Sequence, residues 1–203
     1  MSGRTSRFNE SSLRILSPQQ RANSNFLSAL TRKDIVGISF VLAQGADIEL
    51  KNRDGETGLI WASKEGLGKI AKKLLESEAD PNATSYDNTT ALHWAAKNGD
   101  VKTAARLIAA GADMEARNHV ERTPLHEAAA YGKARIVALL IEKGADVKAR
   151  WTVWDDEYTP LDMAMRYAHT ETAALLRAEV NRCADMARKR LLQNLAQLKP
   201  RRY

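Results

Sequence analysis

The chain has 203 residues, of which 44% are apolar and 28% charged, and its formal net charge is +6. These proportions are typical of a folded soluble protein and exclude disorder throughout the chain. No run of 18 apolar residues occurs, and residues 1–20 lack the apolar core of a signal peptide, so a cytoplasmic location is expected. The single cysteine, Cys183, excludes an internal disulfide and a Cys-based zinc cluster.

The positive charge is concentrated at the two ends. Residues 1–23 carry four basic residues and one acidic residue, a net charge of +3. Residues 177–203 carry eight basic and two acidic residues, a net charge of +6, so the middle of the chain has a net charge of −3. A function that depends on positive charge is therefore expected at an end.

A period of 33 residues organises the middle of the chain. A triplet of Gly or Glu followed by Ala-Asp begins at residues 45, 78, 111 and 144, in three successive steps of 33. The other residues that keep this step are Thr57, Thr90 and Thr123; Leu59, Leu92 and Leu125; and Gly66, Gly99 and Gly132. A fixed period of this length indicates a repeat architecture.

The segments Thr123-Pro124-Leu125-His126 and Thr90-Ala91-Leu92-His93, with the recurring Gly-Ala-Asp, resemble the ankyrin repeat over roughly residues 24–177. The resemblance implies an all-α ankyrin-repeat solenoid of helix-turn-helix-hairpin units with a long C-terminal helix. It also implies that hairpin tips and first helices contact a ligand on an extended concave surface. At the histidine of the motif, it implies hydrogen bonds between repeats.

Elementary physical chemistry explains the motif. A threonine hydroxyl accepts from the free N–H groups at the start of a helix, and a following proline already has a helical φ. Each repeat threonine is therefore expected to begin a first helix. Gly99 is expected to end a first helix in a left-handed turn, and Gly111 to end a second helix.

The domain division follows from the period. We expect a flexible basic arm over 1–19, an N-terminal capping unit over 20–50, ankyrin repeats over 51–177, and a C-terminal capping helix with a basic tail over 178–203. The repeats divide into 53–85, 86–118, 119–150 and 151–177. In the first unit, Ser24 takes the place of the threonine. Its expected core residues are Phe26, Leu27, Leu30, Ile35, Phe40, Val41 and Leu42.

Two departures from the period occur near the end. Thr159 follows Thr123 by 36 residues, so three extra residues lengthen the preceding hairpin. From Leu161 to Lys199 there is neither glycine nor proline, which favours a long helix. An apolar stripe follows it through Leu176, Val180, Cys183, Ala187, Leu191, Leu195 and Leu198. This helix is interpreted as a cap on the stack, with a partner-binding or dimerising helix as the alternative; a monomer is expected.

All four tryptophans map to the ligand-binding side that the resemblance implies, and tryptophan is enriched at interface hot spots. The alternatives are that Trp61 and Trp94 pack on each other, and that Trp151 and Trp154 form a clasp in the long hairpin. The residues expected to contact a partner are Trp61, Lys64, Tyr86, Trp94, Lys97, Asn98, Arg122, Glu127, Tyr131, Trp151, Trp154, Tyr158, Arg166 and Tyr167.

No motif predicts catalysis, a cofactor or a metal site, so the chain is not expected to be an enzyme. The expected function is binding of another protein, as an adaptor, inhibitor or targeting subunit. The alternative is binding of nucleic acid or an anionic surface through the basic end, which is also compatible with a nuclear address. The ankyrin resemblance leaves delivery to a host cell open as well. The basic residues concerned are Arg188, Lys189, Arg190, Arg201 and Arg202.

Overall fold

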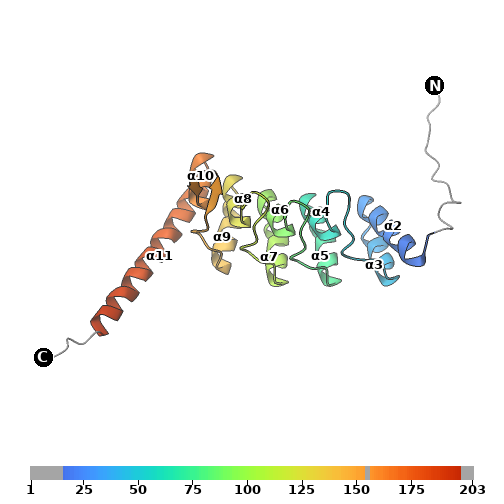
Figure 1. The fold of residues 1–203 in the computed structure, drawn as a ribbon, viewed down its shortest axis with the longest axis horizontal. Helices are drawn as coiled ribbons and strands as arrows, with labels where there is room; N and C mark the ends of the chain where they lie inside the picture. The colour runs from blue at the N-terminus through green and yellow to red at the C-terminus, as the bar shows by residue number, and fades with distance from the viewer. Residues whose placement is uncertain (1–15, 154–155, 198–203) are drawn as a thin grey trace, which may run out of the picture.

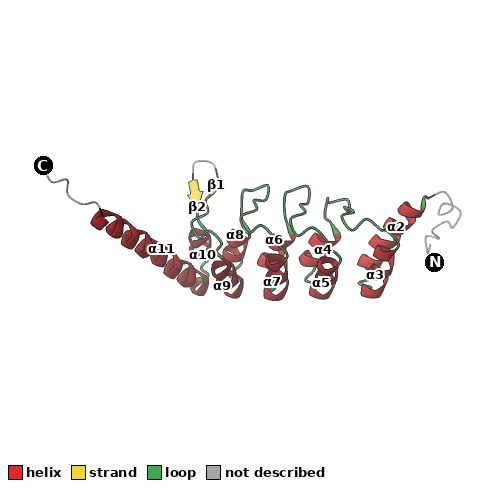
Figure 2. Ribbon diagram, turned by 90° about the horizontal axis from the view of Figure 1, so that it is seen from below, coloured by secondary structure: helices red, strands yellow, loops and turns green. Residues whose placement is uncertain are grey.

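The computed structural model describes residues 16–153 and 156–197, and it confirms the predicted all-α solenoid. Helices stack in successive pairs along an elongated molecule (Figure 1), and the loops that join the pairs project from one side (Figure 2). The pairs are α2 (Pro18–Thr31) with α3 (Ile35–Ala43), α4 (Gly58–Lys64) with α5 (Gly68–Glu76), α6 (Ala91–Asn98) with α7 (Val101–Ala109), α8 (Pro124–Ala130) with α9 (Ala134–Lys143), and α10 (Pro160–Arg166) with α11 (Thr170–Gln197).

The repeat threonines begin the first helices, as predicted. Thr57, Thr90, Thr123 and Thr159 are the N-cap residues of α4, α6, α8 and α10. The Thr90 hydroxyl accepts from the backbone N–H of His93, and Thr159 forms the same bond with Asp162. A side-chain oxygen at this position satisfies one of the four free N–H groups that open every helix.

A continuous apolar core runs through the stack between neighbouring pairs. In the central repeat, Leu92, Ala95 and Ala96 of α6 and Leu107 of α7 are fully buried. The small alanines allow α6 to pack against both α4 and α8. Because each unit buries its apolar face only against its neighbours, the stack is stable only as an assembly of units.

The hairpins are joined by one hydrogen bond that repeats along the chain. The backbone N–H of Asp80 donates to Glu49 Oε1 at 2.8 Å, and the equivalent N–H of Asp146 donates to Glu115 Oε1 at 2.8 Å. Between them, Asp113 donates to Asn82 Oδ1 at 2.7 Å. The aspartate of each Ala-Asp pair therefore docks onto the preceding repeat, which explains part of the 33-residue spacing.

The first unit departs from its predicted position. α2 begins at Pro18, inside the predicted arm, and Ser24 lies within the helix instead of capping it. Ser17 is the N-cap, because its hydroxyl and the Gln20 side chain form a reciprocal capping box. The core assignment of Phe40 was also wrong, since this ring is 62% exposed on α3 at the end of the stack.

Other predicted core residues of this unit have mixed outcomes. Phe26, Leu30 and Val41 are buried as predicted, and Ile38 is buried with them. Leu27 is exposed instead. α3 packs mainly on α2 and α5, and α2 and α3 form the N-terminal end of the stack (Figure 1).

The lengthened hairpin forms a short antiparallel ribbon. Strands β1 (Trp151–Val153) and β2 (Asp156–Tyr158) pair with Trp151 opposite Tyr158 and Val153 opposite Asp156. This ribbon is the lengthened hairpin predicted before α10, and its two strands stand above that helix (Figure 2).

The final helix is the second helix of the fifth pair and continues past the stack. Thr172, Ala173 and Leu176 are buried against α9 and α10, and Val180 and Cys183 are partly buried. All residues from 184 to 194 are exposed, and this part of α11 projects away from the repeats (Figure 1). Of the described residues in the predicted capping segment, which begins at residue 178, only Val180 and Cys183 pack against the core.

A glycine-to-alanine exchange after α7 tests the predicted left-handed helix ends. Gly111 has a φ of +90°, and a Cβ placed there would have nothing within 4 Å, so the exchange isolates backbone strain. We expect Gly111→Ala to lower the free energy of unfolding by about 1 kcal/mol and Gly111→Asn to lower it less, since asparagine tolerates this conformation. Urea unfolding checks this order, and an alanine variant as stable as the parent would contradict it.

Candidate functional site

The hairpin face is the surface formed by the first helices α4, α6, α8 and α10 and by the hairpins before them. Its hairpins all project to the same side of the stack (Figure 2). The first helices stand side by side at the base of the hairpins, because α6 packs on α4 and α8, and α8 on α10. Equivalent positions of successive repeats therefore lie next to one another along this face.

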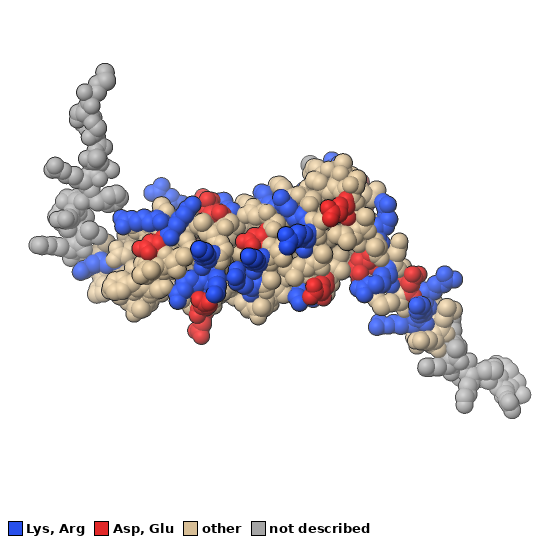
Figure 3. Space-filling model, turned by 180° about the vertical axis from the view of Figure 1, so that it is seen from behind, with Lys and Arg blue, Asp and Glu red and all other residues tan. Residues whose placement is uncertain are grey.

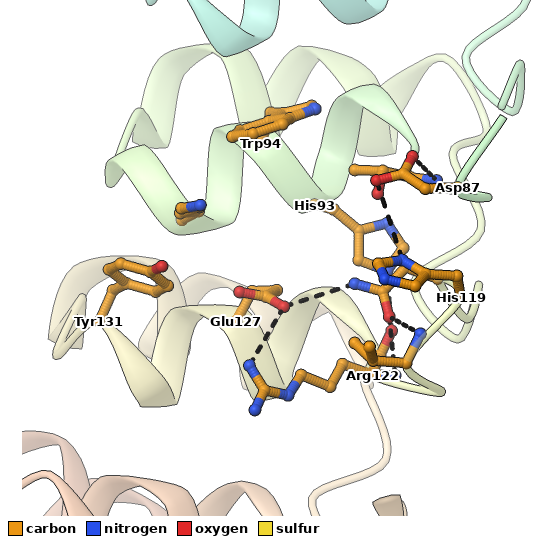
Figure 4. A pocket seen from close by; sticks show the side chains of 11 residues that line it. Asp87, His93, Trp94, His119, Arg122, Glu127 and Tyr131 are labelled. Atoms are coloured by element: carbon orange, nitrogen blue, oxygen red, sulfur yellow. Dashed lines mark hydrogen bonds and ion pairs between the residues drawn. The ribbon is translucent and has the colours of Figure 1, made fainter. Parts of the chain in front are cut away.

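A pocket of about 190 Å³ lies between α6 and α8 on this face (Figure 4). Trp94 of α6 and Tyr131 at the end of α8 stand on opposite sides of it, and Glu127 and Arg122 form its lower wall (Figure 4). The lining residues are Asp87, Thr89, His93, Trp94, Lys97, Asn118, His119, Val120, Arg122, Glu127 and Tyr131. The structure thus brings together five of the predicted contact residues.

Lysine side chains lie over the aromatic rings of this pocket. Lys97 Nζ is 4.7 Å from the centroid of the Trp94 ring and 5.0 Å from that of Tyr131. Lys64 Nζ also lies over Trp94, 5.3 Å from the centroid of its ring. A cation over an aromatic face is attracted by the electrons of the ring. Lys64 and Lys97 therefore both lie near the Trp94 ring, and no aromatic pair joins Trp61 to Trp94 among the described residues.

A charged pair fixes the wall of the pocket next to the long hairpin. Arg122 Nη1 lies 3.7 Å from Glu127 Oε1, and Glu127 is only 8% exposed. Asn118 Nδ2 also donates to Glu127 Oε1, at 3.4 Å. The guanidinium of Arg122 lies 3.9 Å from the centroid of the Trp151 ring. Stacking and ion pairing together hold Arg122 in place between the pocket and the hairpin.

Trp151 takes part in the clasp that the sequence left as an alternative. Its ring centroid is 5.5 Å from that of Tyr158 across the β1–β2 ribbon. The guanidinium carbon of Arg166 on α10 lies 5.5 Å from the centroid of the Tyr158 ring, and Arg166 Nη1 donates to the Tyr158 hydroxyl at 3.3 Å. Trp154 lies outside the described residues.

Other predicted contact residues lie elsewhere on the face. Tyr86 is 75% exposed at a hairpin tip and lines a second hollow with Lys64 and Trp94. Trp61 lines a separate hollow between α2 and α4. Tyr167 is exposed at the end of α10.

Asn98 has a structural role in the described fold. Its Nδ2 donates to the backbone oxygens of Ser63 and Lys64, at 3.0 and 2.9 Å, which joins α6 to α4. The amide donors of Asn98 are therefore engaged between repeats, which argues against the contact role predicted for this side chain.

The sequence also missed two pocket residues at hairpin tips. His119 Nδ1 lies 3.8 Å from Asp87 Oδ2, and the backbone N–H of His119 donates to the backbone oxygen of Asp87 at 2.8 Å. His119 follows Tyr86 by one period of 33 residues, so the repeat frame placed it beside the hairpin that carries Asp87. That frame is the signal that could have identified both residues.

The motif histidines hydrogen-bond between repeats, as the resemblance implied. His93 Nε2 lies 2.9 Å from the Arg122 backbone oxygen, and His126 Nε2 lies 3.2 Å from that of Tyr158. Burial lowers the pKa of His93, and it lowers the pKa of His126 to about 4. Both rings are therefore neutral at physiological pH and act as rigid links.

Two buried donors of residues that line the pocket have no hydrogen-bond partner among the described residues. They are Trp94 Nε1 and Arg122 Nε, which belong to side chains on opposite walls of the pocket. A buried donor without an acceptor costs about 1–3 kcal/mol. Ser63 Oγ in α4 is likewise buried without a partner among the described residues, so such groups are not confined to the pocket.

The structure describes three of the five basic residues that the sequence singled out near the C-terminal end. Arg188, Lys189 and Arg190 are exposed on the projecting part of α11, while Arg201 and Arg202 lie outside the described residues. On the stack itself, basic and acidic side chains are interspersed (Figure 3). Within the described ranges no group of three or more His, Cys, Asp or Glu residues could hold a metal ion, and none of the helices there is long and apolar enough to span a membrane.

Paired helices, projecting hairpins and a hairpin face built from equivalent positions define the chain as a repeat solenoid. The family model of ankyrin repeats (3 copies) matches residues 26–118 and 103–184, so the chain belongs to the ankyrin-repeat family. Ankyrin repeats are generally protein-protein interaction modules. No curated protein matches the sequence.

Proposed function

We propose that the chain binds a partner protein through the hairpin face, with the pocket between α6 and α8 at the centre of the contact. The observation that carries this proposal is the position of Lys97 between the Trp94 and Tyr131 rings. Aromatic and basic side chains at the centre of an interface provide most of its binding energy. Binding of this kind is the property of an adaptor, an inhibitor or a targeting subunit.

The pocket favours a partner that brings an acidic group next to an apolar surface. No ion pair joins Lys97 to a carboxylate in the part of the chain that the structure describes, whereas Glu127 is already engaged by Arg122 and Asn118. The pocket therefore offers a positive charge between two aromatic rings. A carboxylate of the partner would gain a charge-assisted hydrogen bond there.

Replacement of Trp94 tests the proposal. We expect Trp94→Ala to weaken partner binding about 30-fold, equivalent to about 2 kcal/mol, because it removes the ring beneath both lysines. Lys97→Ala is expected to have a smaller effect in the same direction. The measurement is affinity capture from the native host's lysate with the full chain, followed by a Kd for the recovered protein.

The matched control is Lys102→Ala, which removes an exposed lysine of α7 that lines none of these hollows. Circular dichroism and urea unfolding establish that each variant is folded. If the recovered partner binds the Trp94 and Lys102 variants equally well, the hairpin face is not its binding site.

A further inference from the structure

The projecting half of α11 leaves apolar side chains in solvent. Met186, Leu191 and Leu192 are 45%, 59% and 56% exposed. The helix runs to Gln197, well past Cys183, the last of its residues that packs against the core of the stack (Figure 1). Residues 184–197 extend it by about 20 Å at 1.5 Å per residue. The repeats therefore do not account for this half of the helix.

One of these exposed side chains, Leu191, continues a stripe that begins in the core, whereas Met186 lies about 100° from Ala187 and off the stripe. At 100° per residue, Val180, Cys183, Ala187 and Leu191 lie on the same face of α11 as the fully buried Leu176. Spacings of three and four residues make this a narrow seam of the kind that packs against one other helix. Leu192 lies about 100° from Leu191 and falls outside the stripe.

Basic residues border the stripe. Residues 177–194 contain five basic and two acidic residues, a net charge of +3. Glu179 is already paired with Arg182, at 2.6 Å. Arg188 and Arg190 flank Ala187 and Leu191 on opposite sides. At 100° per residue, Arg188 lies about 60–100° from these two residues in one direction around the helix, and Arg190 lies about 60–100° from them in the other. The exposed seam is thus apolar in the middle and positive at its edges.

We infer that residues 184–194 of α11, with Ala187 and Leu191 on the exposed part of the seam, form a docking surface for an amphipathic helix of another protein whose flanking residues are acidic. The seam spacing selects a helix, and the charge selects an acidic one. A second copy of α11 would bring two segments of charge +3 together. Packed helix axes lie about 8–10 Å apart, close to the screening length of about 8 Å at physiological salt, so this repulsion would be only partly screened. The inference is independent of the hairpin face.

A pair of synthetic peptides tests the surface. Each is a helical peptide of about three heptads with leucine along one seam, and its flanking positions carry either glutamate or lysine. The full chain is expected to bind the glutamate peptide at least about tenfold more tightly than the lysine peptide in fluorescence anisotropy. Equal affinity for the two peptides would overturn the inference.

Matched variants locate the contact. Leu191→Gln is expected to weaken binding of the glutamate peptide about tenfold, while Leu192→Gln, on the neighbouring face and of nearly equal exposure, is expected to change it less than about twofold. Arg188→Glu with Arg190→Glu is expected to abolish the preference between the peptides. The charge-matched control is Lys69→Glu with Lys102→Glu on α5 and α7.

Other occupants of the seam give different results. Sedimentation of the full chain as a dimer that Leu191→Gln dissociates would show a second copy on the seam. Tighter binding of duplex DNA or of phosphatidylserine vesicles, unaffected by Leu191→Gln, would show that the basic residues act without the apolar stripe. Either result overturns the inference.

Discussion

Lowering the pH from about 7 to about 4 is expected to reduce the free energy of unfolding by about 3 kcal/mol through His126 alone. Burial is the main cause that lowers the pKa of this ring to about 4, and the positive charges of Arg117 and Arg122 lower it further. In the unfolded chain the pKa is about 6.5. The unfolded state therefore takes up the proton first, and stability is complete above about pH 6.5 and is lost as the pH falls towards 4.

The hydrogen bonds of His126 explain why the neutral ring is required. A carbonyl oxygen only accepts, so Nε2 carries the hydrogen and donates to the Tyr158 oxygen. Nδ1 is then free to accept from the backbone N–H of Thr123, at 3.3 Å. A proton on Nδ1 would oppose that N–H and place a charge on a fully buried side chain. Burial lowers the pKa of His93 in the same direction, so acid is expected to loosen two successive links between repeats.

Urea unfolding between about pH 7 and about pH 4 measures this effect. His126→Gln is expected to be less stable than the parent near pH 7 but to lose less stability on acidification, because its side chain does not titrate. His119→Gln is the control, since the His119 side chain is 59% exposed at a hairpin tip. A His126→Gln variant with the same loss of stability as the parent over this range would contradict the assignment.

The repeat period predicted much of the fold because each motif residue acts locally. A threonine hydroxyl caps the helix that follows it, and a glycine such as Gly111 adopts its left-handed turn without help from distant residues. The first unit was misplaced because the frame was extended to Ser24 by counting. The actual start depends on a different local signal, Ser17-Pro18 with Gln20, which lies outside the frame.

The site was predicted less completely because side-chain positions depend on neighbouring repeats. The frame placed Trp94 and Tyr131 on one face, but only the stacking of α6 on α8 brings Lys97 between their rings. Asn98 is exposed, as its position in the frame indicates, but only the structure shows that its amide donates to backbone oxygens of the preceding repeat. Periodicity identifies which positions are equivalent, but the partner of each side chain is set by the repeat packed against it.

Two leucines of the same stripe on α11 are expected to differ strongly in their effect on stability. Leu176 is fully buried, so Leu176→Ala leaves a cavity and is expected to cost about 3 kcal/mol of unfolding free energy. Leu191 is 59% exposed, and Leu191→Ala is expected to cost less than about 0.5 kcal/mol. Alanine is the best helix former, so neither exchange weakens α11 through its helix propensity.

Urea unfolding gives the size of each effect, and amide hydrogen exchange gives its location. Because each repeat contacts only its neighbours, the Leu176 variant is expected to exchange faster in α9 and the first half of α11 before the central repeats are affected. If Leu191→Ala is as destabilising as Leu176→Ala, the second half of α11 folds back onto the stack in solution as a cap. The exposed seam, and the docking surface inferred from it, would then not exist.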